Sequence, residues 1–275
     1  MGIAVNYSIG INPSSPLPIE KFATVEHNGL STANLLVIIP AYNEASNIAF
    51  VVDELRSYIG QDADILVIDD CSEDGTQDIL KKLGVVFISL PFNLGYAGAL
   101  QAGYKYALAN NYDYVVQFDG DGQHIAKEIE TLFFAYQNGS ADIIIGSRFV
   151  ASGESHRSFL KRIATAIFCY LIKIISGSTL HDPTSGFQLL NRKAYERYSK
   201  VHNFPYYPDA NIIIEMLLNG YRVQEVQVEM RRRILGESMH DGLVRQAKYM
   251  IRIIYSIFII TLKYLPSALN KKIRV

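Results

Sequence analysis

The sequence predicts an α/β protein with a mostly parallel central sheet that is flanked by helices. Short, apolar, β-branched runs alternate with helix-length segments from residue 35 to about residue 147, which is typical of βαβ units. The runs are apolar at nearly every position, as expected of strands that helices cover on both faces. Polar residues follow the runs at their carboxyl ends, where open α/β sheets bind ligands.

Five strands and four helices are expected in this first part of the chain. The strands are the apolar runs at 35–40, 64–69, 85–90, 114–119 and 142–147. The helices between them are expected at 47–58, 76–83, 95–110 and about 126–137. Because a helix separates each strand from the next, the strands run in the same direction and their carboxyl ends meet at one edge of the sheet.

The pattern changes after residue 150. The expected elements are a helix at 158–176 that is apolar on nearly all sides, a loop and a strand at 181–192, a helix at 209–219, one or two edge strands at 221–230, and a last helix from about 243 to 264. We therefore divide the chain into a poorly ordered N-terminal extension (1–33), a core domain (34–240) and a C-terminal amphipathic helix (241–275).

Composition and charge limit the classes of protein to which this chain can belong. Its 275 residues suffice for one domain with a sizeable core, and a hydrophobic content of 49% argues against disorder. The formal net charge is −1, so no overall positive field favours nucleic acid as a partner. Cys71 and Cys169 match no metal-binding or redox spacing and fit a reducing compartment.

We expect neither a signal peptide nor a transmembrane span. Residues 1–33 contain no apolar stretch of the kind that a signal peptide needs. The longest run near the C-terminus without a formal charge is 253–262, which covers roughly half of the ~20 residues needed to cross a bilayer.

Two acids and an amide follow the fourth expected strand, in the stretch Asp119-Gly120-Asp121-Gly122-Gln123. Acids at every second position can converge where a strand opens into a loop, and glycines let the backbone approach a ligand closely. Carboxylate and amide oxygens are the ligands that Mg²⁺ or Mn²⁺ prefers, and such a metal commonly holds a diphosphate. The alternative is a solvated turn, since Asp-Gly is a common turn dipeptide.

Acids also follow the first two strands. Asp69 and Asp70 close the second strand and could accept hydrogen bonds from a base or a ribose. Asp74 is more simply explained as the start of the next helix. Asn43 either contacts a ligand or caps the first helix, a position that Ser46 could also fill. Three strand ends with acids, all at one edge, favour a binding site over three unrelated turns.

The chain also offers cations for an anionic acceptor, because arginine forks suit phosphate oxygens. They are Arg148, Lys161, Arg162, Arg231, Arg232 and Arg233. The alternative for the last three is a solvated, charged edge. His124 and His181 are more simply explained as rim histidines with ordinary hydrogen bonds than as catalysts, and Asp182 either belongs to the site or holds its own turn.

Seven short motifs occur in the order and spacing found in family 2 glycosyltransferases. They are PAYNE (40–44), VIDDCSEDGT (67–76), NLGYAGALQAGYKYA (93–107), FDGDGQ (118–123), GSRF (146–149), DPTSGFQ (182–188) and GES (236–238). Over roughly residues 35–240 the chain resembles this family, most closely its dolichol-phosphate mannose synthase branch and the bacterial polyprenyl-phosphate relatives. The resemblance implies a GT-A fold, with 34–240 as the catalytic domain.

The resemblance also implies a role for each matching residue. The nucleoside pocket would be lined by Pro40, Ala41, Tyr42, Glu44 and Asp70. Asp119 would lie near the ribose and the metal, and Asp121 and Gln123 would be metal ligands beside the diphosphate. The acceptor phosphate would be held by Arg148, Lys161, Thr165 and Arg233. Asp119, Asp121, Arg148 and Arg233 would form the catalytic set. The family often has Arg and Ser where this chain has Lys161 and Thr165, and GESK where it has GESMH, so the details of the acceptor site stay open.

The implied activity is an inverting, Mg²⁺- or Mn²⁺-dependent transfer of a hexose from a UDP- or GDP-sugar to an undecaprenyl or dolichyl phosphate. Such an acceptor needs no general base, because its oxyanion exists near neutral pH. One alternative is transfer to a hydroxyl of a cell-surface polysaccharide, for which Asp182 would serve as base. Another is a catalytically silent protein that binds nucleotide sugars.

Two helices combine apolar faces with basic residues. The helix at 159–176 has cations at both ends, and the last helix carries Arg245, Lys248 and Arg252 at helical spacing. This pattern indicates helices that lie in a membrane interface, at the cytoplasmic face, without crossing the bilayer. The alternative is packing on the core or on a second copy of the chain. A small membrane protein is a further partner that we consider, and no nucleic acid partner is expected.

Overall fold

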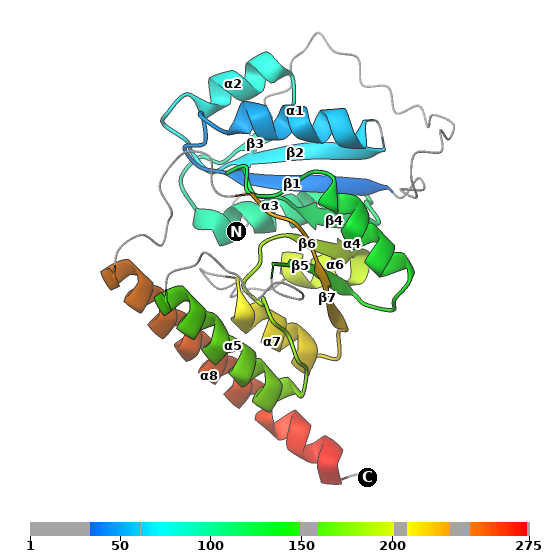
Figure 1. The fold of residues 1–275 in the computed structure, drawn as a ribbon, viewed down its shortest axis with the longest axis vertical. Coiled ribbons are helices and arrows are strands. Elements are labelled where there is room, and N and C mark those ends of the chain that lie inside the picture. Colours follow the sequence, from blue (N-terminus) through cyan, green and yellow to red (C-terminus); the bar gives the residue numbers. More distant parts are fainter. Residues whose placement is uncertain (1–33, 61, 149–158, 201–207, 232–242, 274–275) are drawn as a thin grey trace, which may run out of the picture.

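The computed structural model describes residues 34–273, apart from 61, 149–158, 201–207 and 232–242. In this part of the chain, the strands form one sheet in the order β3-β2-β1-β4-β6-β5-β7. The strands are β1 (Leu35–Ala41), β2 (Ala63–Asp69), β3 (Val86–Ser89), β4 (Tyr114–Gln117), β5 (Ile143–Ser147), β6 (Gln188–Asn191) and β7 (Val223–Gln227). Helices cover both faces of the sheet (Figure 1), so the predicted architecture is confirmed.

One strand of the sheet runs against the others. β6 lies between β4 and β5 and is antiparallel to both, whereas the pairs β1–β2, β1–β4, β2–β3 and β5–β7 are parallel. The first residue of β6, Gln188, therefore pairs with Gln117 and Ile145 near the carboxyl ends of β4 and β5. The segment that precedes β6 therefore lies at the edge of the sheet where the parallel strands end.

Alternate residues of each central strand enter two separate cores, because successive side chains of a strand point to opposite faces. Leu36 and Ile38 belong to one core, and Val37 and Ile39 to the other. The second core is closed by α1 (Ile48–Ile59), α2 (Thr76–Leu83) and α4 (Glu128–Gln137). The first core is closed by α3 (Gly95–Ala109), α5 (Phe159–Ser176), α6 (Arg192–Lys200), α7 (Ala210–Leu218) and α8 (Leu243–Ile273).

The helices α5 and α8 lie together on the side of the molecule away from β3 (Figure 1). The rings of Phe168 on α5 and Tyr249 on α8 meet edge to face, with their centroids 6.4 Å apart. The inner face of α8 enters the core through Ile253, Ile257 and Ile260. Both helices thus pack against the protein on one side only.

The structure differs from the sequence prediction in two elements. The helix α6 was not expected, although Ala194, Tyr195 and Tyr198 have the spacing of a buried helical face. The last helix continues to Ile273 instead of ending near Tyr264. The other predicted strands and helices are present, with ends that differ by no more than three residues apart from the start of the strand expected within 181–192.

Candidate functional site

The turn that follows β4 packs against residues 40–44, which are the end of β1 and the loop after it. A Cβ atom at Gly120 would lie 3.3 Å from the carbonyl oxygen of Pro40 and 3.6 Å from Cγ of Glu44. That contact is close enough that only glycine fits without a shift of its neighbours. The structure therefore brings the Asp119–Gln123 turn and the Pro40–Glu44 loop together at one edge of the sheet, as predicted. Ala41, the last residue of β1, is buried, and Tyr42, which follows it, is exposed.

Hydrogen bonds join the loops that follow β1 and β2. The Asn43 side chain accepts from the amide of Glu73 at 2.9 Å, and the amide of Glu44 donates to the Thr76 hydroxyl at 3.0 Å. Asp74 accepts from the Thr76 amide at 3.1 Å, as expected for an acid at the start of α2. Neither Asn43 nor Ser46 caps α1, since the N-cap position is Asn47. The capping alternative for Asn43 and Ser46 is therefore wrong.

Asp69 and Asp70 are both buried and both accept hydrogen bonds from protein donors. The Asp70 carboxylate accepts from the first amides of the α3 region, those of Leu94 and Gly95, each at 2.7 Å. Burial raises the pKa of Asp70, and the two amides oppose that rise. Asp69 accepts from the side chain of Gln77 at 2.7 Å. A role of Asp70 in the nucleoside pocket stays a prediction. In that role, the Asp70 carboxylate would bind the nucleoside while it also anchors α3.

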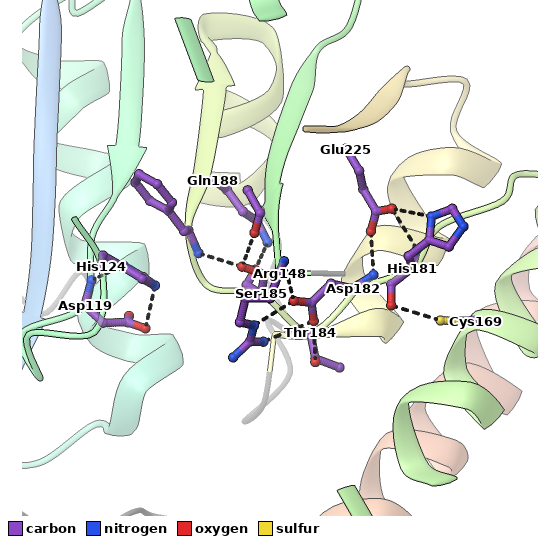
Figure 2. A network of polar contacts seen from close by, with 12 residues as sticks. Asp119, His124, Arg148, Cys169, His181, Asp182, Thr184, Ser185, Gln188 and Glu225 are labelled. Carbon is purple, nitrogen blue, oxygen red and sulfur yellow. Dashed lines mark hydrogen bonds and ion pairs between the residues drawn. The ribbon is translucent and has the colours of Figure 1, made fainter. Parts of the chain in front are cut away.

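Asp119 is held by groups on two sides. The Tyr96 hydroxyl donates to Oδ1 of Asp119 at 2.9 Å. The backbone N–H of Asp119 donates to Nδ1 of His124 at 3.0 Å, and Nε2 of His124 lies 3.6 Å from Oδ2 (Figure 2). Because Nδ1 accepts, the neutral ring carries its proton on Nε2, which faces the carboxylate.

His124 is buried instead of lying at the rim, but its hydrogen bonds are ordinary, as expected. Its ring stacks on Phe187 with the centroids 4.7 Å apart and meets Phe118 edge to face. Burial lowers the pKa of His124 to about 4, which keeps the ring neutral near pH 7. His181 is exposed and pairs with Glu225 at 3.1 Å.

The Asp121 carboxylate accepts from the amide of Gln123 at 3.0 Å and so closes the turn that carries both side chains. Among the described residues, no group of three His, Cys, Asp or Glu side chains is arranged to hold a metal ion. The turn instead offers two carboxylates, from Asp119 and Asp121, and the carboxamide of Gln123. Oxygen donors of these types fit a hard divalent cation, so the chemistry of the donor set agrees with Mg²⁺ or Mn²⁺.

Arg148 and Asp182 form a fork at the same edge (Figure 2). Nε and a terminal nitrogen of Arg148 lie 2.8 and 3.1 Å from the two carboxylate oxygens of Asp182. Burial raises the pKa of Asp182, and the charge of Arg148 opposes that rise. The amide of Asp182 donates to Glu225 at 2.6 Å. The Arg148 side chain remains 30% exposed, whereas the Asp182 side chain is fully buried.

Arg231 is tied to the turn after β4 and to α1. Its backbone N–H donates to the carbonyl of Gln123 at 2.8 Å, and its guanidinium forks to both oxygens of Glu54 at 2.7 Å. The guanidinium also lies 5.3 Å from the ring centre of Phe50. The expectation of a solvated, charged edge is therefore wrong for Arg231, because Glu54 on α1 neutralises it.

Three predicted acceptor-site residues stay untested by this geometry. One of them, Arg233, lies outside the described residues, as does its neighbour Arg232. Lys161 belongs to α5, but its side chain also lies outside the described part. Thr165 lies on the same helix and is partly buried.

Two residues near the site were not singled out from the sequence. Tyr96 was part of a recognised motif, but the motif did not indicate that its hydroxyl would reach Asp119. Asp209 precedes α7 and accepts from the Tyr249 hydroxyl of α8 at 2.7 Å. Burial raises the pKa of Asp209 to about 6, and the charges of Asp119 and Asp182 add to the rise. Only the tertiary structure brings the Tyr96 hydroxyl to Asp119 and places Asp209 within reach of the charges of Asp119 and Asp182.

The outer faces of α5 and α8 expose apolar side chains at helical spacing. On α5 these are Ile163, Ile167, Tyr170 and Ile174, and on α8 they are Ile251, Ile254, Tyr255, Phe258, Ile259 and Leu262. We call these ten residues the outer apolar stripes. Lys173 and Lys248 are exposed on the same helices. None of the described helices has an apolar stretch of the length and hydropathy that a membrane span requires.

Comparison with known proteins gives consistent matches. The sequence profile of glycosyl transferase family 2 matches residues 36–199. The chain is 30% identical over 234 residues to the polyprenol monophosphomannose synthase of Mycolicibacterium smegmatis, covering 80% of this chain and 86% of that protein. It is also 30% identical over 223 residues to the undecaprenyl-phosphate mannosyltransferase of Micrococcus luteus, covering 78% and 90% of the two chains.

Solved structures of low sequence identity share the fold. A mannosyltransferase from Pyrobaculum calidifontis, solved with GDP-Man and Mn²⁺, matches with a TM-score of 0.61 at 17% identity, over 84% of this chain and 66% of that one. The glucosyl-3-phosphoglycerate synthase of Mycobacterium tuberculosis, solved with Mn²⁺, UDP-glucose and phosphoglyceric acid, matches with a TM-score of 0.62 at 18% identity, over 84% and 80% of the two chains.

Proposed function

Because the chain belongs to glycosyl transferase family 2 and has its GT-A fold, we propose that it moves a hexose from a UDP- or GDP-sugar to a polyprenyl phosphate with inversion at the anomeric carbon. The two relatives that are 30% identical carry names with a polyprenol or undecaprenyl phosphate acceptor and mannose. The observation that carries the proposal is the packing of the Asp119–Gln123 turn against the Pro40–Glu44 loop, with Arg148 at the same edge.

The turn after β4 would hold the donor. Asp119, Asp121 and Gln123 would bind a divalent metal, which when bound offsets the charge of the diphosphate and of the departing nucleotide. The loop from Pro40 to Glu44 would enclose the nucleoside, with the exposed Tyr42 ring available to a base. His124 restrains Asp119 by accepting a hydrogen bond from its backbone N–H, and because its ring is neutral it adds no charge near the diphosphate.

The acceptor phosphate would bind at the partly exposed guanidinium of Arg148. An oxygen of the acceptor phosphate forms a bond to the anomeric carbon of the sugar while the bond from that carbon to the diphosphate oxygen breaks. The electron pair of the broken bond leaves with the nucleoside diphosphate. No proton is removed from the acceptor, because the phosphate is already ionised near neutral pH. Asp182 keeps the Arg148 guanidinium in place through its fork.

Transfer of radiolabelled sugar to undecaprenyl phosphate tests this function. UDP-glucose, UDP-N-acetylglucosamine and GDP-mannose would be compared, each with and without Mn²⁺. We expect a metal-dependent, lipid-soluble product from one donor and its loss in Asp121→Ala. Unchanged transfer by the Asp121→Ala protein would contradict the metal-dependent mechanism. Turnover of soluble oligosaccharides alone would contradict the phosphate acceptor.

One observation favours a second candidate, transfer to a sugar hydroxyl. Such a reaction needs a base, and Asp209 is a partly buried carboxyl near Asp119 whose pKa burial raises to about 6. Asp182 suits that role less well, because both of its oxygens are held by Arg148. The two functions differ in their response to Asp209→Asn. A hydroxyl acceptor predicts loss of turnover of about 100-fold or more, whereas a phosphate acceptor predicts that most activity is retained.

The outer apolar stripes of α5 and α8 would rest in the cytoplasmic interface of a membrane. The inner faces of α5 and α8 are buried in the protein core, and the two helices lie together on one side of the molecule (Figure 1). Exposed Lys173 and Lys248 would meet anionic headgroups. A phosphate on a lipid in that interface would then be presented to the protein from the membrane. A small membrane protein or a second copy of the chain is the alternative cover for these stripes.

A further inference from the structure

The hydrogen bond between Tyr96 and Asp119 is enclosed by the segment that precedes β6. A Cβ atom at Gly186 would lie 2.8 Å from the Tyr96 hydroxyl and 3.1 Å from Oδ2 of Asp119. Real Cβ atoms do not approach that closely, so only glycine lets this segment pass over the pair. The hydroxyl, the carboxylate and the backbone of Gly186 are therefore packed as one unit.

Tyr96 is itself fixed by the start of α3. The amides of Leu94 and Gly95, directly before it, both donate to the buried Asp70 carboxylate. Burial, followed by the charge of Asp119, raises the pKa of Tyr96 far above its usual value, so the phenol stays protonated. A continuous series of contacts thus runs from the end of β2, through the first turn of α3, to the carboxylate after β4.

We infer that Tyr96 is a positioning residue of the donor site, whose hydroxyl orients the Asp119 carboxylate before the metal and the nucleotide diphosphate bind. The inference rests on the proposed function, in which Asp119 serves the metal and the ribose. Tyr96 donates to Oδ1, while the protonated Nε2 of His124 faces Oδ2. The Asp119 carboxylate is held at Oδ1 by Tyr96, and His124 fixes its backbone through the Asp119 N–H. A carboxylate restrained in this way loses little rotational freedom when a ligand binds, which favours binding.

The test compares Tyr96→Phe with Tyr104→Phe in the full-length protein. Tyr104 is a matched control because it lies on α3, is buried, and packs against Tyr198 with ring centroids 5.5 Å apart. Free Mn²⁺ would be counted by electron paramagnetic resonance in the presence of UDP or GDP, a readout that needs no turnover. Removal of a hydrogen-bond partner of a metal ligand typically weakens metal affinity by about 10- to 100-fold. We expect that loss in Tyr96→Phe and wild-type affinity in Tyr104→Phe.

Each outcome supports or overturns the inference. Equal Mn²⁺ affinity in the wild type and Tyr96→Phe would overturn it, as would equal weakening in both variants, which would indicate general loosening of α3. If the wild-type protein binds no Mn²⁺ with either nucleotide, the proposed function fails first and the inference with it.

A second variant keeps the test independent of any folding defect in Tyr96→Phe. Gly186→Ala pushes a methyl group against the Tyr96 hydroxyl and Asp119, and we expect it to weaken Mn²⁺ binding as well. If both changes act through the orientation of Asp119, the Mn²⁺ affinity of the double variant should be about equal to that of the single variant with the lower affinity. Fully additive losses would show that they act separately and would overturn the inference.

Discussion

The Asp70 carboxylate holds the start of α3 through two hydrogen bonds, a structural role that its place in a nucleotide-binding motif does not indicate. It is 3% exposed and accepts from two backbone amides at 2.7 Å. These amides belong to the start of α3, where helices leave N–H groups without intrahelical partners and where negative charge is favourable. Asp70 therefore stabilises α3 whether or not it also contacts a nucleoside.

Replacing Asp70 by Asn should lower the free energy of unfolding by about 1–2 kcal/mol, because the amide group of Asn cannot accept from both backbone donors. Urea unfolding followed by circular dichroism measures the change. Asp78→Asn serves as a control, since Asp78 is an exposed acid on α2 paired with Lys81 at 3.5 Å and its loss should cost less than about 0.5 kcal/mol. Equal costs for the two variants would contradict the anchoring role.

His124 should make the protein sensitive to acid. Burial lowers its pKa to about 4 in the folded state, below the ordinary value of 6.5. The unfolded chain therefore binds this proton more readily, and stability is lost as the pH falls from about 6.5 to about 4. The stability advantage of the wild type over His124→Asn should shrink across this range, as measured by urea unfolding at several pH values.

Asp209 titrates in the same range with the opposite sign, because its raised pKa favours the folded state at low pH. It is present in both the wild type and His124→Asn, so its effect cancels in the difference between them. A difference in stability that stays constant from pH 7 to pH 4 would show that His124 is not held neutral by its surroundings.

The element that shapes the site most is β6, and its direction could not be predicted from the sequence. Hydrophobic periodicity located a strand within 181–192 because a buried strand is apolar whichever way it runs. A helix, α5, separates β5 from β6, and such a connection usually joins parallel strands, so the antiparallel direction of β6 is visible only in the tertiary structure. That direction brings Asp182 and Gly186 to the carboxyl ends of β4 and β5, beside Arg148 and Asp119.

The Glu54–Arg231 fork joins α1 to the chain after β7 and should stabilise the turn after β4. Glu54→Gln removes one charge of a pair whose side chains are 17% and 33% exposed. We expect a loss of about 1–2 kcal/mol in the free energy of unfolding. Faster amide exchange is expected in residues 119–124, because Arg231 also holds the carbonyl of Gln123.

Mass spectrometry of hydrogen exchange measures the local effect. The matched control is Glu196→Gln, which removes one charge of the exposed Glu196–Lys200 pair on α6. It should change neither the exchange of residues 119–124 nor, beyond about 0.5 kcal/mol, the overall stability. Unaltered exchange in Glu54→Gln would mean that the fork does not support the turn.

Over the whole molecule, the sequence allowed prediction of which motifs meet, but not of the contacts inside the site. Parallel strands place their carboxyl ends at one edge, so the sequence predicted that residues 40–44 and 119–123 lie at the same edge. That β1 and β4 are neighbours there is known only from the structure. The partners of each side chain depend on tertiary packing. The fork between Arg148 and Asp182, the fork between Arg231 and Glu54, and the bond from Tyr96 to Asp119 therefore became visible only in the structure.

The outer apolar stripes lead to a prediction about the whole molecule. Tyr255 and Phe258 are 65% and 58% exposed on α8, so replacing both by Ser should leave the fold intact. If the stripes rest in a membrane interface, the double variant should float with vesicles of phosphatidylglycerol and phosphatidylethanolamine about tenfold less than the wild type. Vesicle flotation followed by quantitative blotting measures the change.

The control for this experiment lies on the opposite side of the sheet. Phe134 on α4 is 69% exposed, and Phe134→Ser removes one similarly exposed aromatic ring from a face outside the stripes. Flotation lost in the α8 variant but kept in Phe134→Ser would tie membrane binding to α5 and α8, since general hydrophobicity would lower both. Loss of a dimer in the α8 variant, without any change in flotation, would instead identify a second copy as the cover. If the stripes bind a membrane, the Arg148 site works beside a bilayer, where a polyprenyl phosphate is concentrated. If a second copy covers the stripes, the site works on an acceptor that must leave the membrane.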